Sequence, residues 1–326
     1  MSFASCLKEA ARGGGDARDL APDDAQRLFA AMLDGGVPEL ELGALLVALR
    51  MKGESAGELL GFYRALAERV HQLAPPAIAL RTVVLGTYEG GSTQPNLTPL
   101  VALLLRRLGV PVLIHGTLEG HGCVASAYIL RELGVLPCVT LAQVQERLHS
   151  EKLAFVPTAV LAPGLASLLA LRSRLGGCTI ADSAAKLIDP YRGRSLRLVG
   201  GSLSGEIARL REVCFATGER AIVFRGTEGE PYADPRQRPR LEYFDRGGAE
   251  VLFAEEHALQ DPIAGSPNIV DARATAAYTR NALAGAVPLP LPIANQIACC
   301  LYGAGLTADL NQAKAVIAVQ AHALAA

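Results

Sequence analysis

Short apolar segments alternate with helical segments over residues 82–134, and this alternation constrains the fold more than any other feature of the chain. Thr82–Leu85 and Val110–Ile114 have the length and composition of buried strands, and Leu97–Leu108 between them has helical character. A loop that contains glycine follows each apolar segment. Because parallel strands need crossover connections of this kind, the pattern predicts an α/β domain built on a mostly parallel sheet.

The first 75 residues show the pattern of three short amphipathic helices instead. Pro22 and Pro38 stand at helix starts, and the run Ser55-Ala56-Gly57-Glu58 fits a capping box at the start of the third helix. The dipeptide Pro75-Pro76 then interrupts the helical pattern. We therefore expect a small helical bundle that ends before the first strand.

Helical spacing returns from about residue 153 to Pro190, and the chain ends in helices from about Ala272 to Ala325. Strand-like segments lie between them, at Leu196–Val199, Ala221–Phe224 and Val251–Phe253. This order predicts two domains, each made of two separated pieces. We expect the helical domain to comprise residues 1–75 and 153–192, and the α/β domain to comprise residues 76–152 and 193–326.

Half of the residues are apolar and the mean hydropathy is +0.26, so a membrane protein has to be considered. The longest apolar stretches are interrupted by Arg106-Arg107 and by Pro163-Gly164, and neither supplies the ~18 residues that a spanning helix needs. Charged residues are scattered through the first 19 positions, which excludes a secretory signal and favours a cytoplasmic location. The seven cysteines contain no CxxC pair, which argues against a disulfide framework and a zinc site.

The run Gly86-Thr87-Tyr88-Glu89-Gly90-Gly91 lies between a predicted strand and a predicted helix. A glycine-rich turn in that position can offer backbone N–H groups to a phosphate. Here Glu89 places a negative charge where a phosphate would lie, and Tyr88 adds bulk where the backbone should approach closely. The residues alone therefore favour an ordinary turn over a phosphate site.

Three short runs nevertheless follow the predicted helical bundle in a specific order. They are Gly86-Thr87, then Asn96-Leu97-Thr98 at a helix start, then His115-Gly116 after the next strand. This arrangement resembles the anthranilate phosphoribosyltransferase family, or glycosyltransferase family 3, which is similar to the class II nucleoside phosphorylases. The resemblance covers nearly the whole chain. It implies a small helical domain beside a larger α/β domain, with phosphoribosyl pyrophosphate and Mg²⁺ bound between the two.

The chain departs from that family where the chemistry should lie. The family's loop Gly-Thr-Gly-Gly-Asp corresponds to Gly86-Thr87-Tyr88-Glu89-Gly90, and the paired Asp-Glu that holds magnesium corresponds to Gly229-Glu230, with Glu228 beside it. Its basic residues in the Lys-His-Gly run, the following loop and the anthranilate site are replaced by Ile114, Leu118, Cys123 and Cys178.

A highly anionic substrate with Mg²⁺ needs cations and paired carboxylates. We therefore expect no catalytic residue, no cofactor and no bound metal. Glu228 and Glu230 are then remnants of a metal site. The other expected remnants, from the substrate loop, are Gly86, Thr87, Asn96, His115 and Gly116.

The pattern is most similar to a non-enzymatic branch of the family, the YbiB-like proteins. That resemblance implies a homodimer that binds nucleic acids without sequence preference. It rests on the runs Pro38-Glu39-Leu40-Glu41-Leu42-Gly43, Leu49-Arg50-Met51-Lys52-Gly53-Glu54, Leu60-Gly61-Phe62-Tyr63, Asn96-Leu97-Thr98-Pro99-Leu100, Gly226-Thr227-Glu228-Gly229-Glu230 and Ala298-Cys299-Cys300-Leu301.

Local charge agrees with a nucleic-acid partner, although the formal net charge is only −1. Six basic residues and only two acidic ones lie between positions 172 and 197. We expect the helical segment Leu171–Arg197 to line a basic groove for DNA or RNA backbones. The predicted contact residues are Arg106, Arg107, Arg172, Arg174, Lys186, Arg192, Arg194 and Arg209.

Other interpretations stay open at this point. The basic cluster can be a solvated helix face or a set of internal salt bridges. Arg236, Arg238 and Arg240 lie among Asp234, Glu242 and Asp245 and are expected in an exposed loop of mixed charge. The chain can also be a divergent pentosyltransferase that uses phosphoribosyl pyrophosphate and Mg²⁺, or a scaffold that binds a protein through its helical bundle.

Overall fold

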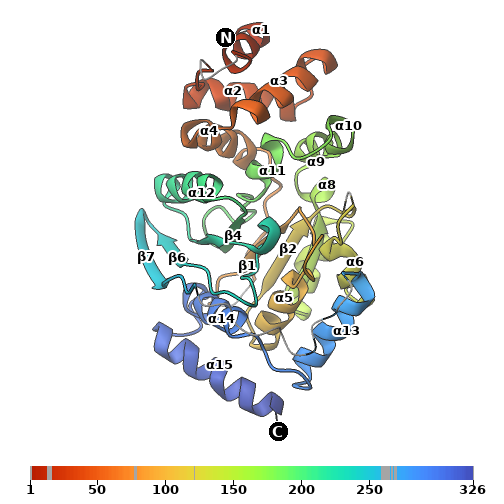
Figure 1. Cartoon of the computed structure of the whole chain (residues 1–326), viewed down its shortest axis with the longest axis vertical. Helices are drawn as coiled ribbons and strands as arrows, with labels where there is room; N and C mark the ends of the chain where they lie inside the picture. Colours follow the sequence, from red (N-terminus) through yellow and green to blue (C-terminus); the bar gives the residue numbers. More distant parts are fainter. Residues whose placement is uncertain are drawn as a thin grey trace. The chain divides into compact units, whose positions relative to one another are not determined.

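A computed structural model gives the fold and describes residues 2–12, 17–76, 79–120, 122–257, 265, 267 and 270–325. The chain divides into two compact units (Figure 1). The helical unit comprises residues 1–72 and 158–190, and the α/β unit comprises residues 73–157 and 191–326. The return to the helical unit therefore comes at Thr158, five residues later than the expected position.

Amphipathic helices build the helical unit, and its core lies between α2 and α4, where the Phe29 and Phe62 rings are 4.9 Å apart. The predicted capping box is confirmed, because Ser55 and Glu58 exchange side-chain to backbone hydrogen bonds. The helices are α1 (Phe3–Ala10), α2 (Pro22–Leu33), α3 (Glu39–Lys52), α4 (Ala56–Ala67), α8 (Thr158–Leu161), α9 (Pro163–Ala170), α10 (Arg172–Leu175) and α11 (Ile180–Ala185).

The sheet of the α/β unit has seven strands in the order β3-β2-β1-β4-β5-β6-β7. The first five are parallel, and β6 and β7 are antiparallel, so the expected mostly parallel sheet is confirmed. The strands are β1 (Val83–Thr87), β2 (Val112–Gly116), β3 (Leu153–Pro157), β4 (Leu196–Gly201), β5 (Ala221–Arg225), β6 (Leu241–Asp245) and β7 (Gly248–Phe253).

Two strands contradict the expectations. Residues 153–157 form the buried edge strand β3 and not a helix, because a run of five apolar residues fits either structure until its pairing partner is known. Residues 241–245 form β6, where no strand was predicted, whereas Arg236, Arg238 and Arg240 precede β6 in a loop, as expected. Glu242 is buried in this strand, and its carboxylate accepts a hydrogen bond from Arg211 at 2.9 Å.

Apolar side chains of the sheet and of the surrounding helices form one continuous core. Helices α14 and α15 pack against each other beside the sheet (Figure 1). The helices of this unit are α5 (Thr98–Arg107), α6 (Ser126–Glu132), α7 (Leu141–Ser150), α12 (Ser204–Thr217), α13 (Ala272–Leu283), α14 (Leu291–Ala304) and α15 (Leu310–Ala325). Within the described ranges, no helix has both the length and the apolar character needed to cross a membrane.

Most cysteines are small core residues. Cys6, Cys138, Cys214, Cys299 and Cys300 are buried, and none of the seven forms a disulfide. Burial raises the pKa of the Cys214 thiol to about 11. These buried thiols are therefore protonated at neutral pH and unreactive.

Candidate functional site

The substrate-loop remnants meet at the carboxyl ends of the central strands. Gly86-Thr87 ends β1 and leads into the glycine-rich loop, His115-Gly116 ends β2, and Gly226–Glu230 follows β5. Strand β4 lies between β1 and β5, and the chain runs outward in opposite directions from β1 and β4. Open α/β sheets bind ligands at such a switch point. The fold therefore places the remnants where a ligand is expected.

The carboxylate of Glu230 occupies the concave side of the glycine-rich loop. Its Oε1 accepts backbone hydrogen bonds from Tyr88 at 3.0 Å, Glu89 at 2.9 Å and Gly90 at 2.9 Å. Gly90 has a φ of +76°, a conformation that suits glycine and lets three successive N–H groups converge. Converging N–H groups of this kind form an anion-binding concavity. In this chain the anion is a side chain of the protein itself.

Side chains complete the shell around the other oxygen of Glu230. Oε2 accepts hydrogen bonds from Thr87 Oγ1 at 2.5 Å, from Asn96 Nδ2 at 3.3 Å and from Thr98 Oγ1 at 3.0 Å. The residue is only 1% exposed. Six donors therefore enclose one buried carboxylate, and both oxygens are engaged.

The position of Glu230 depends on a close approach between β4 and the segment that follows β5. A Cβ atom at Gly200, on β4, would lie 2.6 Å from the carbonyl oxygen of Glu230. Because glycine has no side chain, the segment after β5 can lie against β4 and reach the loop after β1.

Glu228 binds the next part of the same loop. Its carboxylate accepts backbone hydrogen bonds from Ser92 at 2.6 Å and from Thr93 at 2.9 Å, and hydroxyl hydrogen bonds from both residues. Partial burial acts to raise the pKa of Glu228, but these hydrogen bonds outweigh it and hold the pKa below its usual value. Glu228 is therefore ionised at neutral pH and serves as an internal acceptor, as Glu230 does.

Tyr88 and His115 fill the adjacent space. The Tyr88 hydroxyl lies 2.7 Å from His115 Nδ1, and the two buried rings are 5.6 Å apart between centroids. Burial lowers the pKa of His115 to about 3, so the imidazole is neutral at physiological pH. Ile114, at the position of the family's lysine, is fully buried and apolar. The pair is therefore a packed structural contact.

The predicted basic groove is only partly at the surface. Arg172 is buried and paired with Asp182 at 2.6 Å, and Arg197 is buried and paired with Glu219 at 2.9 Å. Lys186 is also buried. The expectation of one basic helical segment from Leu171 to Arg197 is wrong, because Gly176-Gly177 separates α10 from α11 and Arg197 lies on β4.

Four of the predicted contact arginines are exposed. Arg174 lies on α10 of the helical unit, and Arg192 and Arg194 lie in the turn before β4 of the α/β unit. Arg107 ends α5 and donates to the carbonyl of Leu283 at 2.5 Å. The other two, Arg106 and Arg209, are half-buried.

Two features escaped the sequence reasoning. The enclosure of Glu230 was not predicted because the family resemblance suggests only a metal-ligand role for this residue. A signal was present, since the loop lost the family's aspartate while it kept Gly86-Thr87. The second feature is an exposed apolar face of α3, which carries Leu40, Val47 and Met51.

Comparisons with known proteins agree with the fold and the loop positions. The model of the glycosyl transferase family, helical bundle domain, matches residues 5–70. Anthranilate phosphoribosyltransferase of Saccharolobus islandicus (strain L.S.2.15 / Lassen #1) is 34% identical over 235 residues, covering 72% of this chain and 67% of the enzyme. The crystal structure of anthranilate phosphoribosyltransferase (TrpD) from Thermus thermophilus superposes with a TM-score of 0.77 at 25% identity, covering 98% of this chain and 94% of that one.

These findings define a two-unit protein with the helical bundle of the glycosyl transferase family and an α/β unit. The chain belongs to the anthranilate phosphoribosyltransferase family. Within it, the chain is 38% identical over 312 residues to YbiB of Escherichia coli (strain K12), covering 95% of this chain and 97% of YbiB.

Proposed function

We propose that this protein is a non-catalytic member of its family, a cytoplasmic homodimer that binds DNA or RNA backbones without sequence preference. The observation that carries the proposal is the enclosure of Glu230 by the glycine-rich loop. The N–H groups of Tyr88, Glu89 and Gly90 are those that the family resemblance assigns to pyrophosphate, and here they bind a carboxylate.

Binding of phosphoribosyl pyrophosphate would require this carboxylate to leave. The displaced Glu230 would lose six hydrogen bonds and would repel the incoming anion. Mg²⁺ would compete for the same oxygens, since both carboxylates are already hydrogen-bonded. The loop chemistry therefore disfavours the alternative of a divergent pentosyltransferase.

Exposed guanidinium groups support nucleic-acid binding. Arg192 and Arg194 flank Gly193 in one turn, and both are exposed, as is Arg174 in the helical unit. Guanidinium groups bind phosphates through paired hydrogen bonds and read no base sequence. The chain contains no tryptophan and only 5% aromatic residues, so base stacking is scarce and affinity should be electrostatic.

Fluorescence anisotropy with labelled random oligonucleotides at increasing salt tests the function. We expect micromolar binding to single and double strands at about 50 mM salt, with affinity that falls linearly on a log–log plot against salt. A flat salt dependence, or no binding at about 50 mM salt, would contradict the proposal. Calorimetry with phosphoribosyl pyrophosphate and Mg²⁺ distinguishes this function from the pentosyltransferase alternative. Saturable micromolar binding is required by the enzyme and would contradict the proposal.

The exposed face of α3 supports the homodimer. Leu40, Val47 and Met51 are 83%, 41% and 80% exposed, and their spacing of seven and four residues places them on one side of the helix. Contiguous apolar surface of this kind is typical of protein interfaces. A twofold dimer would bring the same face of two copies together.

Charge on this face should separate the subunits. We expect the double variant Leu40→Asp, Met51→Asp to be monomeric by light scattering at micromolar concentration, because two carboxylates per subunit would be desolvated at the interface. Oligonucleotide affinity should fall with it, since a dimer doubles the phosphate contacts. The matched control is Leu203→Asp, an exposed apolar residue just before α12, which should stay dimeric. A double variant that remains a dimer excludes this face as the interface.

A further inference from the structure

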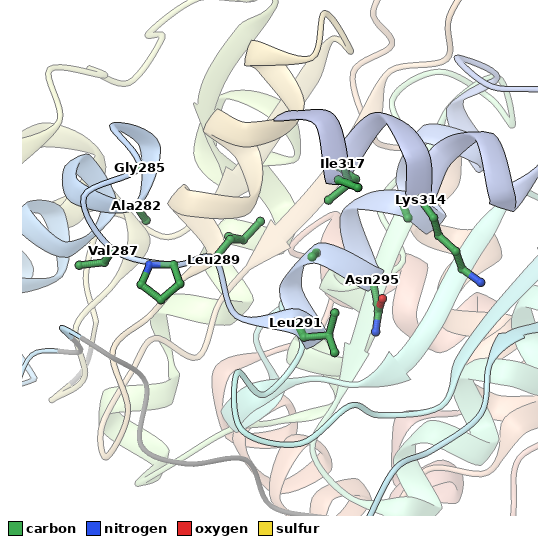
Figure 2. Close-up of a pocket in the computed structure, with 12 residues that line it drawn as sticks. Ala282, Gly285, Val287, Leu289, Leu291, Asn295, Lys314 and Ile317 are labelled. Carbon is green, nitrogen blue, oxygen red and sulfur yellow. The ribbon is translucent and has the colours of Figure 1, made fainter. Parts of the chain in front are cut away.

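A cavity of about 500 Å³ lies in the α/β unit, apart from the glycine-rich loop (Figure 2). Its walls come from α14, α15 and the segment that joins α13 to α14. The size is within the range of sites for small organic ligands. None of the residues discussed for nucleic-acid binding lines it.

The lining is mostly apolar and is arranged by two helices. Leu291 and Asn295 are four residues apart on one side of α14, and Lys314 and Ile317 are three residues apart on one side of α15. In Figure 2, Val287 and Leu289 lie on the left, the side chains of Asn295 and Lys314 lie on the right, and Leu291 lies beside Asn295. The cavity therefore has an apolar part and a polar end.

Asn295 contributes a polar amide at that end of the cavity. The residue is 9% exposed and lines the cavity, and within the described part of the chain its side-chain amide forms no hydrogen bond. The amide nitrogen and oxygen stay accessible from the cavity. The amide therefore offers both a donor and an acceptor to a molecule in the cavity.

Lys314 gives the polar end a positive charge. Its ammonium group lies 4.8 Å from the centroid of the Phe253 ring and, among the described residues, forms no ion pair. None of the described residues that line the cavity is acidic. A ligand with a negative head group is complementary to this end, and an apolar body is complementary to the rest.

We propose that this cavity binds a small amphipathic carboxylate. Its apolar chain packs against Val287, Leu289 and Ile317, and its carboxylate accepts hydrogen bonds from the Asn295 amide and the Lys314 ammonium. The site is independent of the proposed function, because it shares no residue with the phosphate contacts or with the Glu230 loop.

Isothermal titration calorimetry with decanoate on the full chain tests the proposal. We expect one molecule bound per chain with a Kd of about 100 µM, a value in keeping with the efficiency of small ligands. Neutral decanol and cationic decylamine carry the same chain and should bind at least about tenfold more weakly. Equal affinity for the three probes, or no saturable heat with decanoate, would overturn the proposal.

Substitutions locate the binding to this cavity. Lys314→Met at an exposed position and Asn295→Leu should each weaken decanoate binding about tenfold. Ala294→Phe, which fills the space, should abolish it. Lys8→Met is the matched control, since Lys8 is exposed on α1 and lies outside the cavity. Urea unfolding establishes that each variant is folded, and unchanged affinity in Lys314→Met would assign the heat to another surface.

Discussion

Glu230→Ala is expected to lower the free energy of unfolding by about 4 kcal/mol, a large part of the stability of an ordinary domain. The substitution removes the acceptor of three backbone N–H groups and three side-chain donors, all in a buried shell. Each donor left without a partner costs about 1–3 kcal/mol unless water enters. Urea unfolding followed by circular dichroism measures the effect.

Glu228→Ala is the matched control for this variant. Glu228 carries the same carboxylate two residues earlier, but its hydrogen bonds to Ser92 and Thr93 lie at the exposed side of the loop, so water can replace it. We expect a loss of no more than about 1 kcal/mol. If both variants lose the same stability, the enclosure of Glu230 is not what holds the loop.

An added anion should restore the Glu230→Ala variant in part. With the carboxylate gone, the three converging N–H groups are open to inorganic phosphate or sulfate. A ligand that binds only the folded state raises the free energy of unfolding by about 2.7 kcal/mol when its concentration is a hundred times its Kd. The wild-type protein should show no comparable gain. Equal effects of phosphate on the two proteins would contradict the assignment of this loop as a filled anion site.

The double charge reversal Arg192→Glu, Arg194→Glu is expected to weaken oligonucleotide binding about a hundredfold at about 100 mM salt. Each phosphate contact contributes about 0.9 to the log–log salt slope, so two lost contacts should reduce the slope by nearly 2. The loss should be the same for all sequences, because backbone contacts carry no base information. Anisotropy titrations over a salt series measure both quantities.

Arg236→Glu, Arg238→Glu provides the same change in charge with the same spacing. These arginines are paired with Asp234 at 3.6 Å and with Glu256 at 3.4 Å, and we do not count them among the phosphate contacts. The control should lose less than about threefold, through the long-range field alone. Similar losses in both variants would show that net charge matters and the turn before β4 does not.

The order of helices and parallel strands could be predicted because it rests on local patterns. Periodic apolar residues marked α2 to α5, and short apolar runs marked β1, β2, β4 and β5. Strand β3 was misjudged because Leu153–Pro157 is apolar throughout and has no alternation. Strand β6 was not predicted because a glutamate such as Glu242 is normally exposed. Its pairing with Arg211, which allows its burial, cannot be recognised in the sequence.

The positions of the site residues could be predicted from the sequence, but their hydrogen bonds and burial could not. Gly86, Thr87, Asn96, His115 and Gly116 could be placed at the strand ends from their order in the chain, and the structure gathers them there. That Glu230 turns inward depends on a donor shell assembled from separate segments, which no local pattern encodes. The burial of Arg172 likewise follows from its pairing with Asp182, since a charge run alone does not distinguish a surface from an internal ion pair.

The glycine-rich loop and its carboxylate also set an order of events in folding. Tyr88 and Glu230 are 142 residues apart in the chain, so their contact is strongly non-local. Contacts of long sequence separation form late, because chain closure is opposed by entropy. During synthesis the loop after β1 is complete long before residue 230 emerges. Glu230 can therefore meet the loop only after the segment that follows β5 has been synthesised.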